Sequence, residues 1–168
     1  QAAPTKRTMQ ELDQLLQYIA HNPTPSQTLT RNGMTLFGAA DASFAGEPAA
    51  KSRAGGAVWL ANKDGSANAP LHCSSTLIGV VVGSAAEAEY AALHLLGTTV
   101  VWLRVILEAL GFPQPTNPGT ALFSDSDCAR GIANRTNKLR RTKAMDVRFH
   151  WTRDQVERPS LDPERRHR

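Results

Sequence analysis

The sequence has only two cysteines, few aromatic residues and no long apolar run. Cys73 and Cys128 cannot form a disulfide framework and make no metal-binding spacing with the five scattered histidines, so we expect both to be small core residues. No apolar run approaches the ~18 residues of a membrane span, and the start QAAPTKRTMQ lacks the apolar stretch of a signal peptide. These absences predict a soluble, intracellular protein that is not secreted.

The remaining composition is typical of one globular domain. The chain has 168 residues, of which 41% are hydrophobic and 20% charged, enough to bury a core. Its net charge of +4 is unevenly distributed, because 12 of the 19 Lys and Arg lie at positions 130–168, against five Asp and Glu. This asymmetry indicates a polyanionic partner near the C-terminal third.

Hydrophobic patterning in the first half predicts one helix and three strands. Residues 5–20 carry apolar side chains at the spacing of an amphipathic helix, and the polar segment 21–33 follows as a connector. Residues 34–40, 54–60 and 70–74 are short, strand-like runs, and 63–66 form a good hairpin turn before the third run. We therefore expect three antiparallel strands.

The second half alternates helices with one strand. Ser84 and Glu87 form a Ser-x-x-Glu capping box before a helix over 85–110, although Gly97 weakens its middle. A strand over 121–124 precedes a helix to about 134, capped by Ser126 or Asp127. A basic connection over 135–143 and a helix over 144–156 follow, and we expect 157–168 to be a polar, disordered tail. The order indicates an α/β layer fold with a mixed sheet.

Three acidic residues lie where different elements are expected to meet. Asp41 follows the first strand, Glu89 lies in the first turns of the long helix, and Asp125 ends the fourth strand. Carboxylate oxygens are hard ligands that suit Mg²⁺, which takes further ligands from water and substrate phosphate. If the three carboxylates converge, their mutual repulsion favours a metal ion between them. Such a cluster is a plausible nuclease centre.

Each acid also has an ordinary structural interpretation. Asp41 could be a turn aspartate after a strand, and Asp125 could be the N-cap of the next helix. Glu87 and Glu89 compete for the helical position, but the capping box assigns Glu87 to the backbone and leaves Glu89 to face the sheet.

A basic run follows the predicted third helix. Its charged side chains could contact phosphates of a nucleic acid, or they could form a solvated loop. The candidate nucleic-acid-binding residues are Arg135, Lys138, Arg140, Arg141, Lys143 and Arg148.

Six segments resemble, in order, the ribonuclease H domain of copia-type retrotransposon polyproteins, which contain a reverse transcriptase and a ribonuclease H. The segments are PTKRTMQELDQLLQYIAHNP, FGAADASFAG, KSRAGG, SAAEAEYAAL, LFSDSDCARGIAN and RRTKAMDVRFHWTRDQV. The resemblance covers nearly everything from residue 4 to about 156. It implies a ribonuclease H-like fold with helices on both faces of a central mixed sheet. It also divides the chain into a connecting helix and linker from a preceding reverse transcriptase (1–33), the ribonuclease H-like domain (34–156) and the tail (157–168).

The same resemblance implies a chemistry. Asp41, Glu89 and Asp125 match the family's metal ligands, which hold two Mg²⁺ ions, for which Mn²⁺ can substitute. Family members cut the RNA strand of an RNA–DNA hybrid and leave 5′-phosphate and 3′-hydroxyl ends. We therefore expect a hybrid substrate and a reverse transcriptase domain of the same polyprotein as partners, in the cytoplasm or nucleus.

The sequence departs from the family after residue 156. The family continues with a strand, a Pro-rich turn and a helix that carries a fourth metal-binding Asp, whereas this chain reads ERPSLDPERRHR. We therefore expect the last strand and helix to be missing, with neither to position Asp162. Asp146 matches a position on the preceding helix and is expected to be a structural or surface residue. The alternative function is an inactive remnant that binds nucleic acid or docks on a polymerase.

Overall fold

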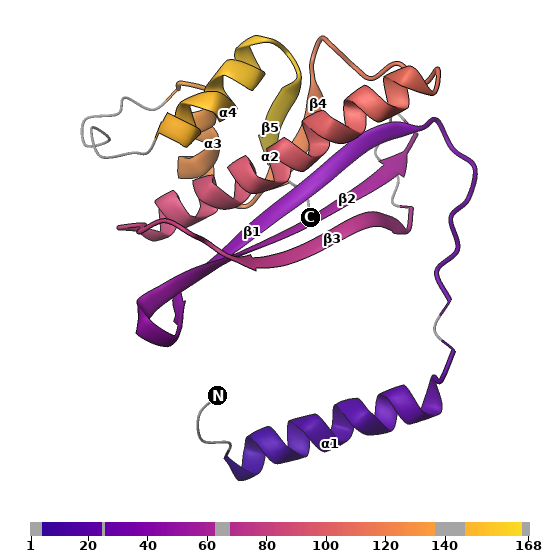
Figure 1. Ribbon diagram of the computed structural model, residues 1–168, viewed down its shortest axis with the longest axis vertical. Helices are drawn as coiled ribbons and strands as arrows, with labels where there is room; N and C mark the ends of the chain where they lie inside the picture. Colours follow the sequence, from indigo (N-terminus) through magenta and orange to yellow (C-terminus); the bar gives the residue numbers. More distant parts are fainter. Residues whose placement is uncertain (1–4, 25, 63–67, 137–146, 166–168) are drawn as a thin grey trace.

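A computed structural model describes residues 5–24, 26–62, 68–136 and 147–165, without the side chains of 147–149 and 165. Its elements, in order, are α1 (Lys6–His21), β1 (Thr35–Glu47), the 3-10 turn η1 (Pro48–Ala50), β2 (Lys51–Ala61), β3 (Pro70–Leu77), α2 (Ala85–Ala109), β4 (Thr120–Ser124), α3 (Asp127–Ala133), α4 (Val147–Glu157) and β5 (Leu161–Arg165). The strands form one sheet in the order β3-β2-β1-β4-β5 (Figure 1). The first three are antiparallel, and β4 and β5 continue in parallel. The predicted mixed α/β fold is confirmed.

Strand β1 is longer than its apolar run. It pairs with β2 from Thr35 opposite Ala61 to Ser43 opposite Arg53, and resumes at Glu47 opposite Lys51 after an irregularity. The residues after 40, which lie outside the strand-like run predicted from the sequence, are therefore largely strand. The predicted hairpin turn at 63–66 lies outside the described residues.

Helix α2 is continuous across its predicted weak point. The Ser84 hydroxyl accepts a hydrogen bond from the Glu87 N–H, and the Glu87 carboxylate accepts one from the N–H of Gly83. A Cβ on Gly97 would lie 2.9 Å from Cδ1 of Leu161, so glycine here allows β5 to approach the helix closely. Length and hydropathy alone would let α2 cross a membrane, but half of that window is buried, as in the core helix of a folded domain.

The end of the chain corrects the sequence prediction. Residues 161–165 are not a disordered tail, because β5 pairs with β4 from Thr120 opposite Leu161 to Ser124 opposite Arg165. The last strand is therefore present. Leu161 and Pro163 are buried on the α2 side, and Asp162 alternates to the other face. A proline is tolerated here because β5 is an edge strand.

The packed helices lie on one face of the sheet, which we call the closed face. Helices α2, α3 and α4 contact one another there, and Leu36, Val58 and Leu122 are fully buried beneath them. The opposite, open face carries the stacked rings of Phe37, Trp59 and Phe123. Within the described part of the chain, no helix is packed on this face, which differs from the expectation of helices on both faces.

Helix α1 forms as predicted but lies apart from the domain, beyond the β3 edge of the sheet (Figure 1). Thr5 and Thr8 form its N-terminal capping box, and none of its sixteen residues is buried. The two cysteines are also not core residues. Cys73 on β3 and Cys128 on α3 are both exposed, because β3 is an edge strand and Cys128 lies on the outer side of α3.

Candidate metal centre

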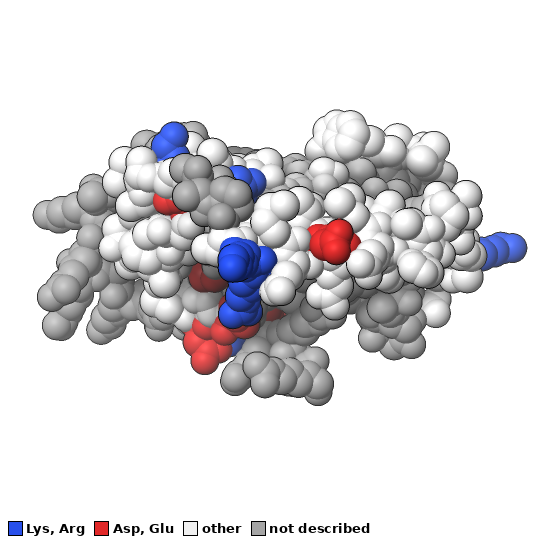
Figure 2. Space-filling view, turned by 90° about the horizontal axis from the view of Figure 1, so that it is seen from below, with Lys and Arg blue, Asp and Glu red and all other residues white. Residues whose placement is uncertain are grey.

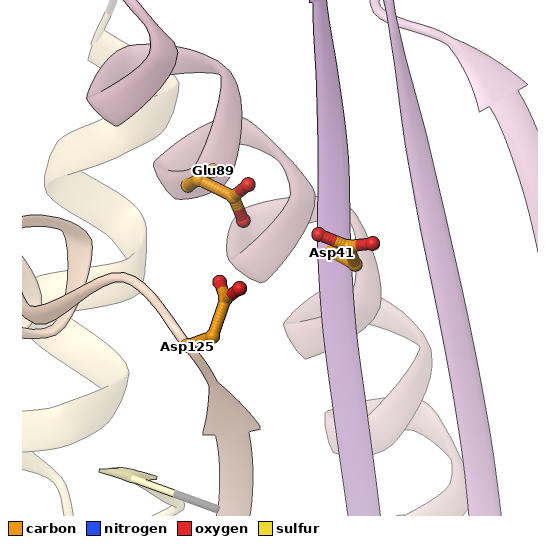
Figure 3. A group of neighbouring side chains, drawn as sticks. All are labelled: Asp41, Glu89 and Asp125. Atoms are coloured by element: carbon orange, nitrogen blue, oxygen red, sulfur yellow. The ribbon is translucent and has the colours of Figure 1, made fainter.

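The three predicted acids converge. One carboxylate oxygen from each of Asp41, Glu89 and Asp125 lies within 4.8 Å of the other two. The three side chains come from β1, α2 and the residue after β4, and they point toward a common space (Figure 3). They are 36 to 84 residues apart in the chain, so only the folded domain brings them together.

Asp41 is held by a strand rather than a turn. It lies opposite Gly55 inside the continuous β1–β2 pairing, which excludes the interpretation as a turn aspartate. Its Oδ1 accepts a hydrogen bond of 2.9 Å from the N–H of Ala42. This local bond fixes the carboxylate while leaving the side chain exposed.

Asp125 is not a helix cap. The N-cap of α3 is Ser126, whose hydroxyl accepts a hydrogen bond of 3.2 Å from the N–H of Ala129. Asp127, in the first turn, forms an ion pair with Arg130. Both neighbouring polar residues therefore serve α3, and the Asp125 carboxylate is left for the cluster.

Glu89 is the most constrained of the three. Its Oε1 accepts a hydrogen bond of 3.2 Å from the Ala42 N–H, while its Oε2 is buried without a hydrogen-bond partner in the described structure. Burial, followed by the negative charge of Asp41 and to a lesser degree that of Asp125, raises the pKa of Glu89 to about 7, although the Ala42 hydrogen bond opposes this shift. A positive charge beside this carboxylate would therefore stabilise its ionised form near neutral pH.

The donor set fits a hard divalent cation. Three carboxylates within reach of one ion and a buried oxygen without a partner are what such a cation would complete. The Ala42 N–H, which bonds to both Asp41 and Glu89, was missed at the sequence level because a backbone amide leaves no residue signature.

An open groove of about 460 Å³ begins beside Asp41 and Asp125. Its wall is made mostly of small or apolar residues of β1, β2 and β4: Ala39, Ala40, Gly55, Gly56, Ala57, Phe123 and Ser124. The acids therefore lie at the polar end of a largely apolar surface.

Asp162 does not join the cluster. Its register opposite Ala121 places it four residues before the level of Asp125 along parallel strands, or roughly 13 Å away. Among the described residues, the acids close enough to share an ion with Asp41 are Glu89 and Asp125. The presence of β5 thus does not supply a fourth acid at this position.

The predicted basic interface is mostly outside the described structure. Arg135 is exposed and forms an ion pair with Glu157. Lys138, Arg140, Arg141 and Lys143 lie outside the described residues, as does Asp146, and the Arg148 side chain is likewise not described. Their role in nucleic-acid binding remains a prediction.

A mixed sheet in the order β3-β2-β1-β4-β5, with acids contributed by β1, α2 and the end of β4, defines an α/β fold of the ribonuclease H-like class. Solved structures of ribonucleases H match this fold. The chain matches LC11-RNase H1, isolated from compost, with a TM-score of 0.54 and 18% identity, covering 80% of this chain and 86% of that one. It matches the N-terminal RNase H domain of rv2228c from Mycobacterium tuberculosis with a TM-score of 0.51 and 18% identity, covering 79% and 84%.

The chain is similar in sequence to Pol polyproteins of plant transposons. The chain is 28% identical over 158 residues to the retrovirus-related Pol polyprotein from transposon TNT 1-94 of Nicotiana tabacum, and 27% identical over 160 residues to that from transposon RE1 of Arabidopsis thaliana. Each match covers 94% of this chain but only 11% and 10% of the relatives, so the chain spans about a tenth of their length. No family model matches. The predicted resemblance to the ribonuclease H domain of a retrotransposon polyprotein is confirmed.

Proposed function

We propose that this domain is a metal-dependent endonuclease that cleaves the RNA strand of RNA–DNA hybrids during retrotransposon reverse transcription. The observation that carries the proposal is the convergence of Asp41, Glu89 and Asp125 on a ribonuclease H-like fold. The products would be 5′-phosphate and 3′-hydroxyl ends.

In the proposed reaction, the side chains of this domain position the metal ions. Asp41, Glu89 and Asp125 would hold the cations through their carboxylates, and Ala42 keeps two of these carboxylates oriented. Mg²⁺, or Mn²⁺ in its place, supplies Lewis acidity at the phosphate and lowers the pKa of a bound water when it is present. Glu89 must lose its proton to serve as a ligand, so protons compete with the metal ion and metal binding should strengthen as the pH rises.

The relatives and solved structures support the proposed substrate and partner. LC11-RNase H1 has been solved in complex with an RNA/DNA hybrid, matching this chain with a TM-score of 0.53, and the plant relatives are Pol polyproteins. A hybrid would be selected by its shape and by 2′-hydroxyl contacts rather than by base sequence. A reverse transcriptase domain of the same polyprotein is the proposed partner, and the setting would be intracellular.

A second candidate function is an inactive remnant that binds nucleic acid or docks on a polymerase. It is favoured by one observation, which is that the described structure brings three acids together while Asp162 lies roughly 13 Å along the sheet. Fewer ligands hold a second ion less well, and a displacement of ~1 Å can already cost about 100-fold in rate.

Cleavage of an end-labelled RNA–DNA hybrid tests the proposal. The protein is incubated with the hybrid in Mg²⁺ and separately in Mn²⁺, beside Asp41→Asn and the matched control Asp127→Asn. Asp127 is an exposed acid that pairs with Arg130 outside the cluster. We expect RNA cleavage that falls at least about 100-fold in Asp41→Asn and is unchanged in Asp127→Asn.

Hybrid binding, measured by fluorescence anisotropy on the same samples, separates the two candidates. If the RNA stays intact in every lane and hybrid affinity is unchanged by Asp41→Asn and by chelator, the protein is an inactive remnant that binds nucleic acid. Intact RNA without hybrid affinity would overturn both functions. Cleavage that persists in Asp41→Asn would place the chemistry elsewhere.

A further inference from the structure

We propose that α1 folds back over the open face of the sheet and forms the second helical layer of this domain. The proposal concerns packing within one chain and does not depend on nuclease activity. It assigns one occupant to two apolar surfaces that the described structure leaves without a partner.

The first surface is the apolar stripe of α1. Its five apolar side chains recur at helical spacing and are all 45–55% exposed: Met9, Leu12, Leu15, Leu16 and Ile19. An amphipathic helix of this length is stabilised in water mainly by packing of its apolar face. Packing of this stripe against an apolar partner surface would therefore stabilise α1.

The second surface is the open face. Phe37, Trp59 and Phe123 stack with ring centroids 6.1 to 6.2 Å apart, and Trp59 and Phe123 remain partly exposed. Ala39 and Ala57 continue this surface along the groove beside the acids. Alternation along each strand puts these side chains opposite to those that α2 covers.

The linker brings α1 to the open face. Its second half is fixed to the domain, since Gln27 donates to the Pro70 carbonyl, Thr30 bonds to Asn68, and Asn32 donates to the Leu60 carbonyl. Only residues 22–26 separate the end of α1 from this anchored part, and they span at most roughly 17 Å. Stacked sheets pack about 10 Å apart and a helix with its side chains is about 10–12 Å in diameter, so the reach is sufficient.

The edge strand decides which face α1 can cover. On the open face, β3 presents Cys73, Ser75 and Leu77, and Pro70 lies opposite Trp59 after a register shift. The other face of β3 carries His72, Ser74 and Thr76. Helix α2 already covers the closed face over β1 and β2. Since α1 starts from the Pro70 end of β3, the apolar surface in its reach is the open one.

Length and charge then fix the orientation. The 16 residues of α1 span about 24 Å, and four strand spacings are about 19 Å. With His21 tethered near β3, Lys6 and Arg7 would lie over β4 and β5, where Asp162 and Glu164 face outward. Figure 2 views the molecule from the side on which α1 lies, and some acidic and basic side chains lie next to one another left of its centre.

A disulfide between α1 and the native Cys73 tests the proposal in the full chain. Cys73 lies opposite Ala57 on the open face and is exposed, and Cys128 is replaced by serine to remove the other thiol. Ile19→Cys places a thiol on the apolar stripe, and the matched control Gln17→Cys places one on the opposite side of the helix. Both variants are oxidised at low protein concentration with copper phenanthroline and mapped by peptide mass spectrometry.

We expect an intramolecular disulfide to Cys73 in Ile19→Cys and at least several-fold less in Gln17→Cys. Equal yields would mean that α1 collides at random on a flexible tether, and this would overturn the proposal. No disulfide in either variant would also overturn it, and a disulfide between chains would assign the open face to a second copy.

Thiol modification gives a second readout. In the otherwise native chain, Leu12→Glu with Leu16→Glu should release α1 and make alkylation of Cys73 several-fold faster. Gln10→Glu with Gln14→Glu adds the same charge on the polar side and should leave the rate unchanged. An unchanged rate in the Leu12→Glu and Leu16→Glu protein would contradict the docked helix.

Discussion

Neighbouring residues of β4 lie in opposite environments. Leu122 is fully buried beneath α2 on the closed face, whereas Phe123 is partly exposed on the open face. Asp41 follows the same alternation as Phe37 and Ala39, so it rises from the open face, and its neighbour Ala40 is buried under the helices. The two faces of the sheet therefore have different roles. The closed face supplies stability through packing, and the open face presents Asp41, which Glu89 approaches from α2.

The largest expected effect is the loss of a closed-face side chain. Leu122→Ala should lower the free energy of unfolding by about 2–5 kcal/mol, because it removes contacts and leaves a cavity. In a chain whose α1 is released by Leu12→Glu and Leu16→Glu, Phe123→Ala should cost only about 1–2 kcal/mol, since part of its ring is already in water. Urea denaturation measures both, and equal losses would remove the distinction between the faces.

The next largest expected effect is a loss of stability at β5, which forms one edge of the sheet. A Cβ on Gly119 would lie 2.7–2.8 Å from backbone atoms of Pro159, Ser160 and Leu161. Gly119→Ala should therefore push β5 away and cost about 1–3 kcal/mol of stability. Gly79→Ala is the control, because nothing lies within 4 Å of its Cβ. If thermal unfolding of the two variants coincided, β5 would not be an integral strand.

The smallest expected effect is a pH dependence that arises at the acid cluster. The pKa of Glu89 is raised from 4.5 to about 7 in the folded protein, mainly by burial and then by Asp41. Its contribution to stability is thus fully present below pH 4.5 and is lost as pH rises toward 7.

In EDTA, the melting temperature of the native protein should therefore fall between pH 4.5 and 7 more than that of Glu89→Gln. Added Mg²⁺ should reduce the fall by neutralising the cluster. Parallel curves for the two proteins would show that Glu89 titrates normally.

The acids and the order of elements could be predicted because they carry strong local signals. Apolar runs preceded Asp41 and Asp125, and the capping serine before α2 separated the role of Glu87 from that of Glu89. Their convergence within 4.8 Å required the parallel pairing of β1 with β4, which no local pattern specifies.

The missed features depend on tertiary contacts. The segment that forms β5 contains Pro163 and three charged residues, so its composition resembles a solvated tail. Its alternation was nevertheless present, because Leu161 and Pro163 face the core while Asp162 and Glu164 do not. In the same way, Gly97 was taken as a weakness of α2, whereas its lack of a side chain is what lets Leu161 pack.

The parallel pairing of β1 with β4 also has a kinetic consequence. Strands β1, β2 and β3 are joined by local connections, but Ala39 meets Phe123 only after the intervening 83 residues have been looped back. Closing such a loop costs entropy before its contacts form, which makes nonlocal pairing slow. A chain in which only the hairpins have formed carries Asp41 without its two partners, so the metal centre is assembled only when the long-range half of the sheet is completed.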